Sequence, residues 1–162
     1  GIAGLTILII KNKLLSDCNK ELLPMFDYSA HAEEASMLNT SPVFSWYVSG
    51  LIFDWITEQG GVGMMGKVNM EKSSLLYNYI DESSFYSNPV SKPYRSWMNI
   101  PFILARDDLE NDFIQSAEDE GLFNLKGHRT VGGMRASVYN AMPIEGIKKL
   151  IAFMDDFAKL HE

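Results

Sequence analysis

The sequence predicts an α/β chain in two parts: residues 1–61 form the tail of a doubly wound domain, and residues 62–162 form a small α+β domain. Two observations carry this prediction. Residues 5–10, LTILII, are continuously apolar, as in a strand buried on both faces of a parallel sheet. After residue 62 the pattern predicts helix, strand, helix, strand, strand and helix, which is typical of a small sheet covered by helices.

The first part is dominated by one long helix. Residues 11–20 indicate a short helix or loop, and residues 26–28 a short strand. Ser41 and Pro42 are expected to open the long helix, because a hydroxyl caps free amides and proline suits the first turn. Gly60 and Gly61 end it. Apolar side chains lie almost all round this helix, so we expect it to be buried or to lie at a subunit interface.

The second part alternates helices and short strands. Residues 62–80 predict a helix, residues 81–94 a loop and residues 96–104 a strand. The residues expected to face inward from the first helix are Met65, Val68, Leu75, Leu76, Tyr79 and Ile80.

A capping box at Asp107 and Glu110 is expected to start the next helix. That helix buries an apolar stripe of Leu109, Phe113 and Ala117. Residues 122–125 and 134–139 predict two strands, and the second one alternates between two faces. Pro143 opens the last helix, whose buried stripe comprises Ile144, Ile147, Leu150, Ile151, Met154 and Phe157.

Composition excludes several classes of protein. The net charge of -7 argues against a nucleic-acid partner, which requires a basic surface. No apolar run is long enough to span a membrane. The single cysteine, Cys18, excludes a disulfide framework and a cysteine metal cluster, and it fits a reducing, cytoplasmic setting. We find no metal-ligand spacing, so no metal is expected.

The candidate functional residues gather in the stretch KGHRTVGGMRASVYN, residues 126–140. Arg135 lies within a strand pattern, and its planar fork matches a carboxylate. The alternative is a structural salt bridge to one of the chain's own carboxylates. His128 and Arg129 follow Gly127 and can donate to a phosphate or carboxylate, or they can belong to a solvated loop.

A second candidate site is the pair Asn39 and Thr40, just before the long helix. A helix cap is the commonest use of such residues. The positive end of the helix dipole also makes this position a natural seat for a phosphate.

Taken together, four stretches resemble the phosphoserine aminotransferase family. They are GLTILII, SMLNTSPVFSWYVSGLIFDWI, RSWMNIPF and LKGHRTVGGMRASVYNAMPIEG. The resemblance covers essentially the whole chain and matches the C-terminal part of that enzyme. It implies the fold type I, class V group of aminotransferases, with residues 1–61 from the large cofactor-binding domain.

The resemblance also implies a function. The family uses pyridoxal 5'-phosphate to convert 3-phosphohydroxypyruvate and glutamate into O-phosphoserine and 2-oxoglutarate, in serine and, in many bacteria, pyridoxine biosynthesis. It implies a homodimer in which Asn39 and Thr40 reach the cofactor phosphate of the other subunit. Arg135 matches the arginine that binds a substrate carboxylate. His128 and Arg129 match the pair at the phosphate or distal carboxylate.

The family's Schiff-base lysine has no counterpart here, because it would precede Gly1. We therefore expect a fragment without catalytic residues, inactive as a transaminase when alone. One alternative is a stand-alone, non-catalytic module of the same fold for anion binding and dimerisation. Another keeps the enzyme class and changes the substrate to a different amino acid.

Overall fold

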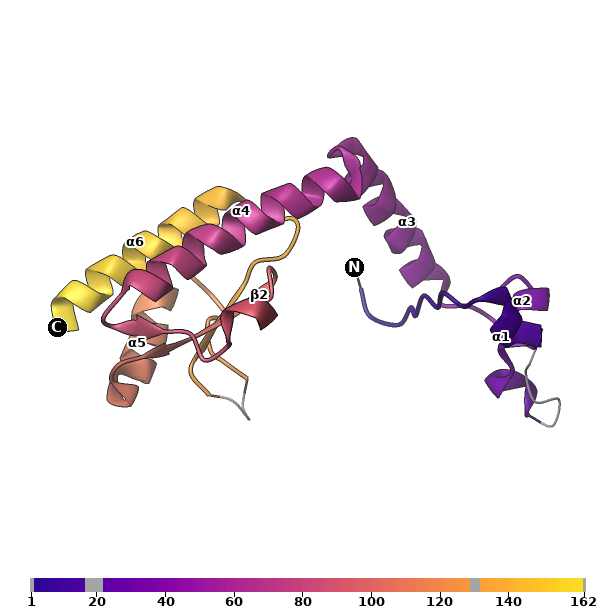
Figure 1. The fold of residues 1–162 in the computed structure, drawn as a ribbon, viewed down its shortest axis with the longest axis horizontal. Helices are drawn as coiled ribbons and strands as arrows, with labels where there is room; N and C mark the ends of the chain where they lie inside the picture. The colour runs from indigo at the N-terminus through magenta and orange to yellow at the C-terminus, as the bar shows by residue number, and fades with distance from the viewer. Residues whose placement is uncertain (1, 17–21, 129–131, 162) are drawn as a thin grey trace. The chain divides into compact units, whose positions relative to one another are not determined.

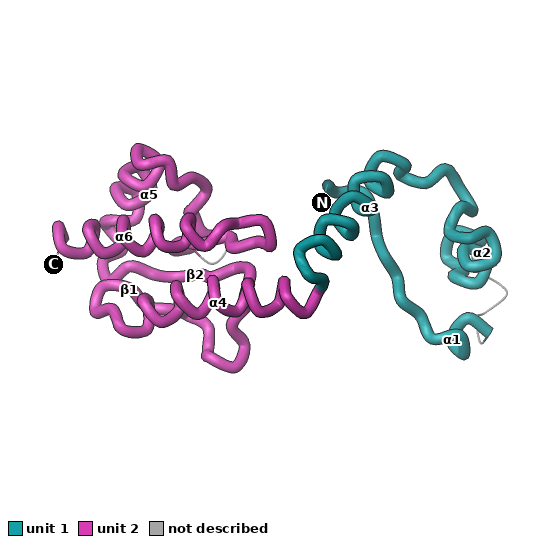
Figure 2. The backbone as a smooth tube through the Cα atoms, turned by 90° about the horizontal axis from the view of Figure 1, so that it is seen from above, with its two compact units in different colours: residues 1–61 teal, residues 62–162 magenta. Residues whose placement is uncertain are grey.

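The computed structural model describes residues 2–16, 22–128 and 132–161. Cys18 and Arg129 lie outside the described residues. The chain divides into two compact units, residues 1–61 and residues 62–162 (Figure 2).

Unit 1 is built from helices. Its elements are α1 (Asn12–Ser16), the 3-10 helix η1 (Pro24–Phe26), α2 (Tyr28–Glu33) and α3 (Val43–Glu58). Asp27 caps α2 by accepting a hydrogen bond from the backbone amide of Ser29 at 2.8 Å. The strand expected at residues 26–28 is therefore wrong, because a capped helix occupies this part of the chain.

The long helix α3 starts and ends close to the predicted points. Pro42 is its N-cap rather than its first helical residue, and no side chain caps it, so the capping role expected of Ser41 is wrong. The end is as predicted: Gly60 follows the last turn with φ of 92°, a left-handed conformation that glycine adopts without strain.

Residues 5–10 do not form the buried strand that the sequence predicts. They carry no strand assignment, and the side chain of Ile9 is 94% exposed. A strand requires a neighbour to complete its ladder of backbone hydrogen bonds, and the described residues supply none for this run.

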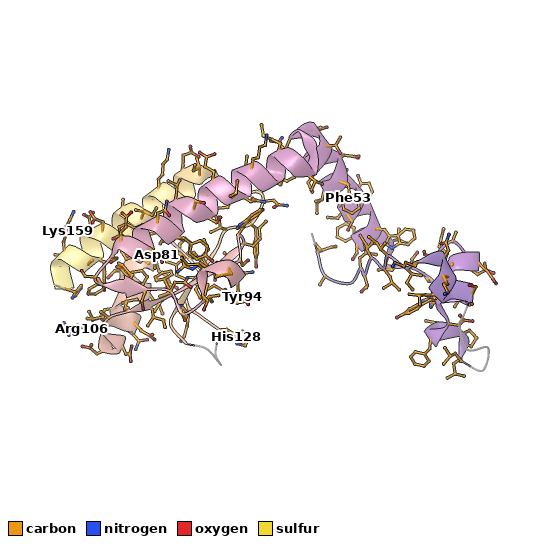
Figure 3. The ribbon with its side chains drawn as sticks, in the orientation of Figure 1. Phe53, Asp81, Tyr94, Arg106, His128 and Lys159 are labelled. Atoms are coloured by element: carbon orange, nitrogen blue, oxygen red, sulfur yellow. The ribbon has the colours of Figure 1, made fainter. Side chains whose placement is uncertain are left out.

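The apolar surface of α3 is largely exposed. Its only buried residue is Ser45, whereas Phe44 is 70% and Tyr47 64% exposed. Phe53, labelled in Figure 3, is also exposed. Of the two expectations for this helix, burial within the chain is therefore wrong.

Unit 2 is a three-stranded antiparallel sheet with helices. The strands are β1 (Tyr86–Ser87), β2 (Asn99–Leu104) and β3 (Met134–Ser137), in the order β1-β2-β3. The helices are α4 (Gly61–Glu82), η2 (Lys92–Tyr94), η3 (Asp107–Leu109), α5 (Glu110–Asp119) and α6 (Ile144–His161).

One face of this sheet forms the core. Helices α4 and α6 run alongside each other over it (Figures 1 and 2). Alternate residues of β2 and β3 are buried against them, among them Ile100, Phe102 and Met134. Phe113 from α5 is fully buried, and its ring meets those of Phe102, Tyr86, Phe153 and Phe157 edge-on.

Several local predictions in unit 2 are wrong. Leu109 is the N-cap of α5 and no side chain caps it, so the expected capping box of Asp107 and Glu110 does not form. Residues 122–125 are not a strand, because only an isolated bridge joins Lys126 to Met134. The short strand β1 lies in the expected loop. The buried stripes of α5 and α6 are confirmed in outline.

The inward face of helix α4 agrees only in part with the one expected. Val68 and Leu75 are partly exposed, whereas Asn69 and Lys72 are buried. Met65, Leu76 and Ile80 are buried as predicted.

Candidate functional site

Arg135 lies on the face of β3 that is turned away from the core. The burial of β3 alternates, so Met134 and Ala136 are buried while Arg135 and Ser137 are half-buried. The Nε of Arg135 is buried and has no hydrogen-bond partner. Among the described residues no carboxylate forms an ion pair with it. The structural salt bridge that was the alternative is thus not formed within the described chain, and the guanidinium has no carboxylate partner there.

A tight hairpin carries this arginine. The amide of Arg135 donates to the carbonyl of Leu125 at 2.7 Å, and the amide of Gly127 donates to the carbonyl of Gly133 at 2.8 Å. A Cβ at Gly127 would overlap the carbonyl oxygens of Gly132 and Gly133. Glycine is therefore required at residue 127 by the close approach of two backbone segments, beyond any need for a turn.

His128 lies on the same hairpin, on the loop that leaves the sheet away from α4 (Figure 3). Its side chain is exposed, and its carbonyl accepts a hydrogen bond from the amide of Gly132 at 2.8 Å. The fold thus brings His128 and Arg135 onto one hairpin. Arg129, the third residue predicted for this site, lies outside the described residues.

Asn39 and Thr40 belong to unit 1 and precede α3. Both are exposed, and Asn39 Nδ2 donates a long hydrogen bond of 3.4 Å to the carbonyl of Thr40. Because no side chain caps α3, neither residue serves as the helix cap. Neutral hydroxyl and amide donors beside the positive end of a helix dipole suit a phosphate group. These residues therefore fit the phosphate of a cofactor.

Three buried polar residues of α4, Asn69, Lys72 and Ser73, were not predicted. The Nζ of Lys72 donates to the carbonyls of Tyr139 and Met142 at 2.9 Å each and of Asn140 at 3.3 Å. One turn earlier, Asn69 Nδ2 donates to Asn140 Oδ1 at 2.8 Å. Helical periodicity could have predicted the burial of residues 69 and 72, because they lie on the same face of the helix as Met65, Leu76 and Ile80.

An ion-pair cluster fixes the segment that leads into β2. Arg95 makes two hydrogen bonds to the carboxylate of Asp81, at 2.7 and 2.8 Å, and its guanidinium lies 4.7 Å from the centre of the Tyr77 ring. The hydrogen bonds from Arg95 lower the pKa of Asp81 to about 2, and Lys92 adds to this effect. Burial of the Tyr77 hydroxyl, which donates to the carbonyl of Ser96, raises its pKa.

Two kinds of feature, a membrane-spanning helix and a metal-binding cluster, are absent from the described residues. Across the described residues, no helix has the length and apolarity needed to cross a membrane. Within the same part of the chain, no group of three or more His, Cys, Asp or Glu side chains is arranged to hold a metal ion.

Comparison with known proteins agrees with the resemblance seen in the sequence. The phosphoserine aminotransferase of Acinetobacter baumannii (strain ACICU) is 55% identical over 98% of this chain and 44% of its own length. That of Pseudomonas fluorescens (strain SBW25) is 52% identical over 99% of this chain and 45% of its own. The chain thus spans less than half the length of the curated relatives that it matches.

Solved structures show the same likeness. A phosphoserine aminotransferase from Bacillus circulans subsp. alkalophilus matches with a TM-score of 0.89 and 40% identity, over 94% of this chain and 43% of that one. A phosphoserine aminotransferase from Trichomonas vaginalis with bound PLP matches at 0.78 and 34% identity, over 85% and 39%. The family model for class-V aminotransferases matches residues 1–150. This chain therefore belongs to the class-V aminotransferase family.

Proposed function

We propose that these residues are the C-terminal part of a phosphoserine aminotransferase. The whole enzyme would transfer an amino group from glutamate to 3-phosphohydroxypyruvate and release O-phosphoserine and 2-oxoglutarate, in serine and pyridoxine biosynthesis in the cytoplasm. Residues 1–61 would complete its large domain, and residues 62–162 would form its small domain. The relatives of this name, at 51–55% identity, support the proposal.

The single observation that carries the proposal is the state of Arg135. A half-buried guanidinium whose Nε has no partner is costly unless a ligand completes its hydrogen bonds. A carboxylate matches its planar fork in a bidentate way. Each substrate and product of the reaction has an α-carboxylate, so Arg135 can hold all of them in turn.

His128 and Arg129 are proposed to bind the other end of the substrate. They would bind the phosphate of phosphoserine in one half-reaction and the distal carboxylate of glutamate in the other. One pocket of hydrogen-bond donors serves both, because both groups are anionic and present oxygen acceptors.

Asn39 and Thr40 are the residues proposed to bind the cofactor. We propose that they donate to the phosphate of pyridoxal 5'-phosphate held by a second subunit, with the exposed apolar side chains of α3 contributing to the homodimer interface. When bound, this cofactor supplies an electron sink for the carbanion at the substrate's α-carbon. The lysine that attaches it is proposed to lie outside residues 1–162, so this part alone binds substrate without converting it.

The test compares the KM values of variants of the full encoded chain for phosphorylated and unphosphorylated substrates. Arg135→Lys is expected to raise KM for phosphoserine and for glutamate together, on the order of 10- to 100-fold, because lysine cannot reproduce the bidentate contact. His128→Ala is expected to raise KM more for phosphoserine than for an unphosphorylated amino acid. Arg106→Lys is the matched control, since Arg106 pairs with Asp108 on the surface.

Equal losses on phosphorylated and plain substrates in His128→Ala would refute the phosphate pocket and favour an aminotransferase for another amino acid. If the full encoded chain shows no cofactor absorbance even after pyridoxal 5'-phosphate is added, the non-catalytic module for anion binding and dimerisation is the alternative that is left.

A further inference from the structure

The buried ammonium of Lys72 is unusual because its hydrogen-bond partners are backbone carbonyl oxygens. Its side chain is 0% exposed, and lysine is almost never fully buried unless it is paired. Its three donors meet three acceptors, the carbonyls of Tyr139, Asn140 and Met142. Burial lowers its pKa, because removal from water disfavours the charged form.

All three acceptors belong to one turn, residues 139–142. Asn69 binds the same turn through the side chain of Asn140, and the amide of Met142 closes it by donating to the carbonyl of Tyr139 at 2.9 Å. Two residues from successive turns of α4 therefore fix this segment. Removing the ammonium would leave three carbonyl oxygens without this donor.

The turn is the direct continuation of β3. The amide of Val138 still donates to the carbonyl of Met98 at 2.6 Å, so the chain stays extended up to the turn. Successive residues of an extended chain alternate between two faces, which places Arg135, Ser137 and Tyr139 on the same face. The Tyr139 hydroxyl reaches Asn99 Oδ1, 3.4 Å away on β2. The backbone fixed by Lys72 is thus the C-terminal anchor of the face that carries Arg135.

We propose that Lys72 is a positioning residue for substrate binding: by fixing the backbone of residues 139–142, its ammonium holds β3 in the register and orientation that aim Arg135 at the substrate. The proposal rests on the role proposed for Arg135 above. It adds a residue that touches neither substrate nor cofactor and acts through the strand.

The test is a double-mutant cycle in the full encoded chain. Lys72→Met keeps the length of the side chain and removes its donors. It is expected to raise KM for glutamate and phosphoserine about tenfold while kcat changes less than about threefold. In an Arg135→Ala background the same change is expected to alter KM by less than about twofold, because the residue through which it acts is gone. Lys67→Met, an exposed lysine on the same helix, is the control.

Two further measurements keep the proposal testable. If Lys72→Met does not fold, Asn69→Ala removes a single bond to the same turn and should raise KM about threefold, again only when Arg135 is present. Hydrogen exchange reports on the turn directly: the amides of Val138 and Met142 are expected to lose protection in both variants and to keep it in Lys67→Met.

The outcomes separate the two proposals. An equal rise in KM with and without Arg135 would overturn the positioning role and leave Lys72 as a purely structural residue. Unchanged exchange at Val138 and Met142 would overturn it as well. If the unmodified chain shows no transamination, the proposed function fails, and the exchange measurement still decides whether Lys72 fixes the turn.

Discussion

The substitution Gly127→Ala is expected to open the hairpin that presents His128 and Arg135. An added Cβ would lie 2.5 Å from the carbonyl oxygen of Gly133 and nearer still to that of Gly132. Both atoms are backbone, so neither can move aside without disturbing the hairpin. Gly132 offers a matched comparison, because a Cβ there meets nothing within 4 Å although its φ is +75°.

The magnitudes follow from these two geometries. Opening the hairpin breaks the bonds from Gly127 to Gly133 and from Gly132 to His128, at about 1 kcal/mol each, which sets the cost of Gly127→Ala at about 2 kcal/mol. Gly132→Ala keeps both bonds and adds only the left-handed strain of a residue with a Cβ, about 1–2 kcal/mol. The two variants are therefore similar in stability and differ in the geometry of the site.

The assay pairs equilibrium denaturation with calorimetric titration of phosphoserine into the full encoded protein. Gly127→Ala should weaken phosphoserine binding at least about tenfold, since loss of more than about 1.4 kcal/mol of contacts has that effect. Gly132→Ala should stay within about threefold of the unmodified protein, a change below about 0.7 kcal/mol. Binding by Gly127→Ala that equals or exceeds binding by Gly132→Ala would refute the argument that the close backbone approach shapes the site.

Two further predictions concern stability. Asp81→Asn should lower the free energy of unfolding at pH 7 by about 1 kcal/mol. A pKa that falls from 3.8 to about 2 corresponds to about 2.4 kcal/mol, and solvent screening reduces it. A depressed carboxyl pKa stabilises the fold above pH 3.8, and this stabilisation is lost as the pH falls to about 2. The unfolding free energies of the two proteins should therefore converge near pH 2. A difference that is undiminished at that pH would argue against the ion pair with Arg95 as the cause of the stability loss. Phe113→Ala should cost about 3–5 kcal/mol, measured by denaturant titration, against less than about 0.5 kcal/mol for Phe123→Ala, whose ring is 66% exposed. Similar losses in these two variants would contradict the assignment of the core.

The sequence was sufficient where apolar periodicity alone determines an element. Phe113 and Ala117 on α5 are buried as predicted, and so are four of the six residues of the α6 stripe, because helical spacing places them on one face. The alternation of β3 likewise placed Arg135 opposite Met134. In each case the information is local.

The remaining features depend on groups far away in the chain. Lys72 can be buried because backbone carbonyls 67 to 70 residues later in the chain accept its hydrogen bonds. No local sequence pattern contains these acceptors. Residues 5–10 have strand composition, yet a strand forms only with a neighbour. Strand β1 has only two residues, too few for any period to show. The partnerless Nε of Arg135, on which the proposed function rests, is a property of three-dimensional packing alone.

Burial is distributed unequally between the two units. The described core of unit 2 joins helices α4, α5 and α6 to the sheet, whereas α3 of unit 1 buries only Ser45. Unit 2 can thus behave as one cooperative folding unit, and a ligand bound at Arg135, as proposed above, would stabilise the whole of it. The segment with Asn39 and Thr40 has no comparable core beneath it. In the homodimer proposed above, the partner subunit would cover the apolar side chains of α3 and help to order this segment. Subunit association and cofactor binding would then be thermodynamically coupled. Dilution of the homodimer would favour dissociation of the subunits and release of the cofactor together.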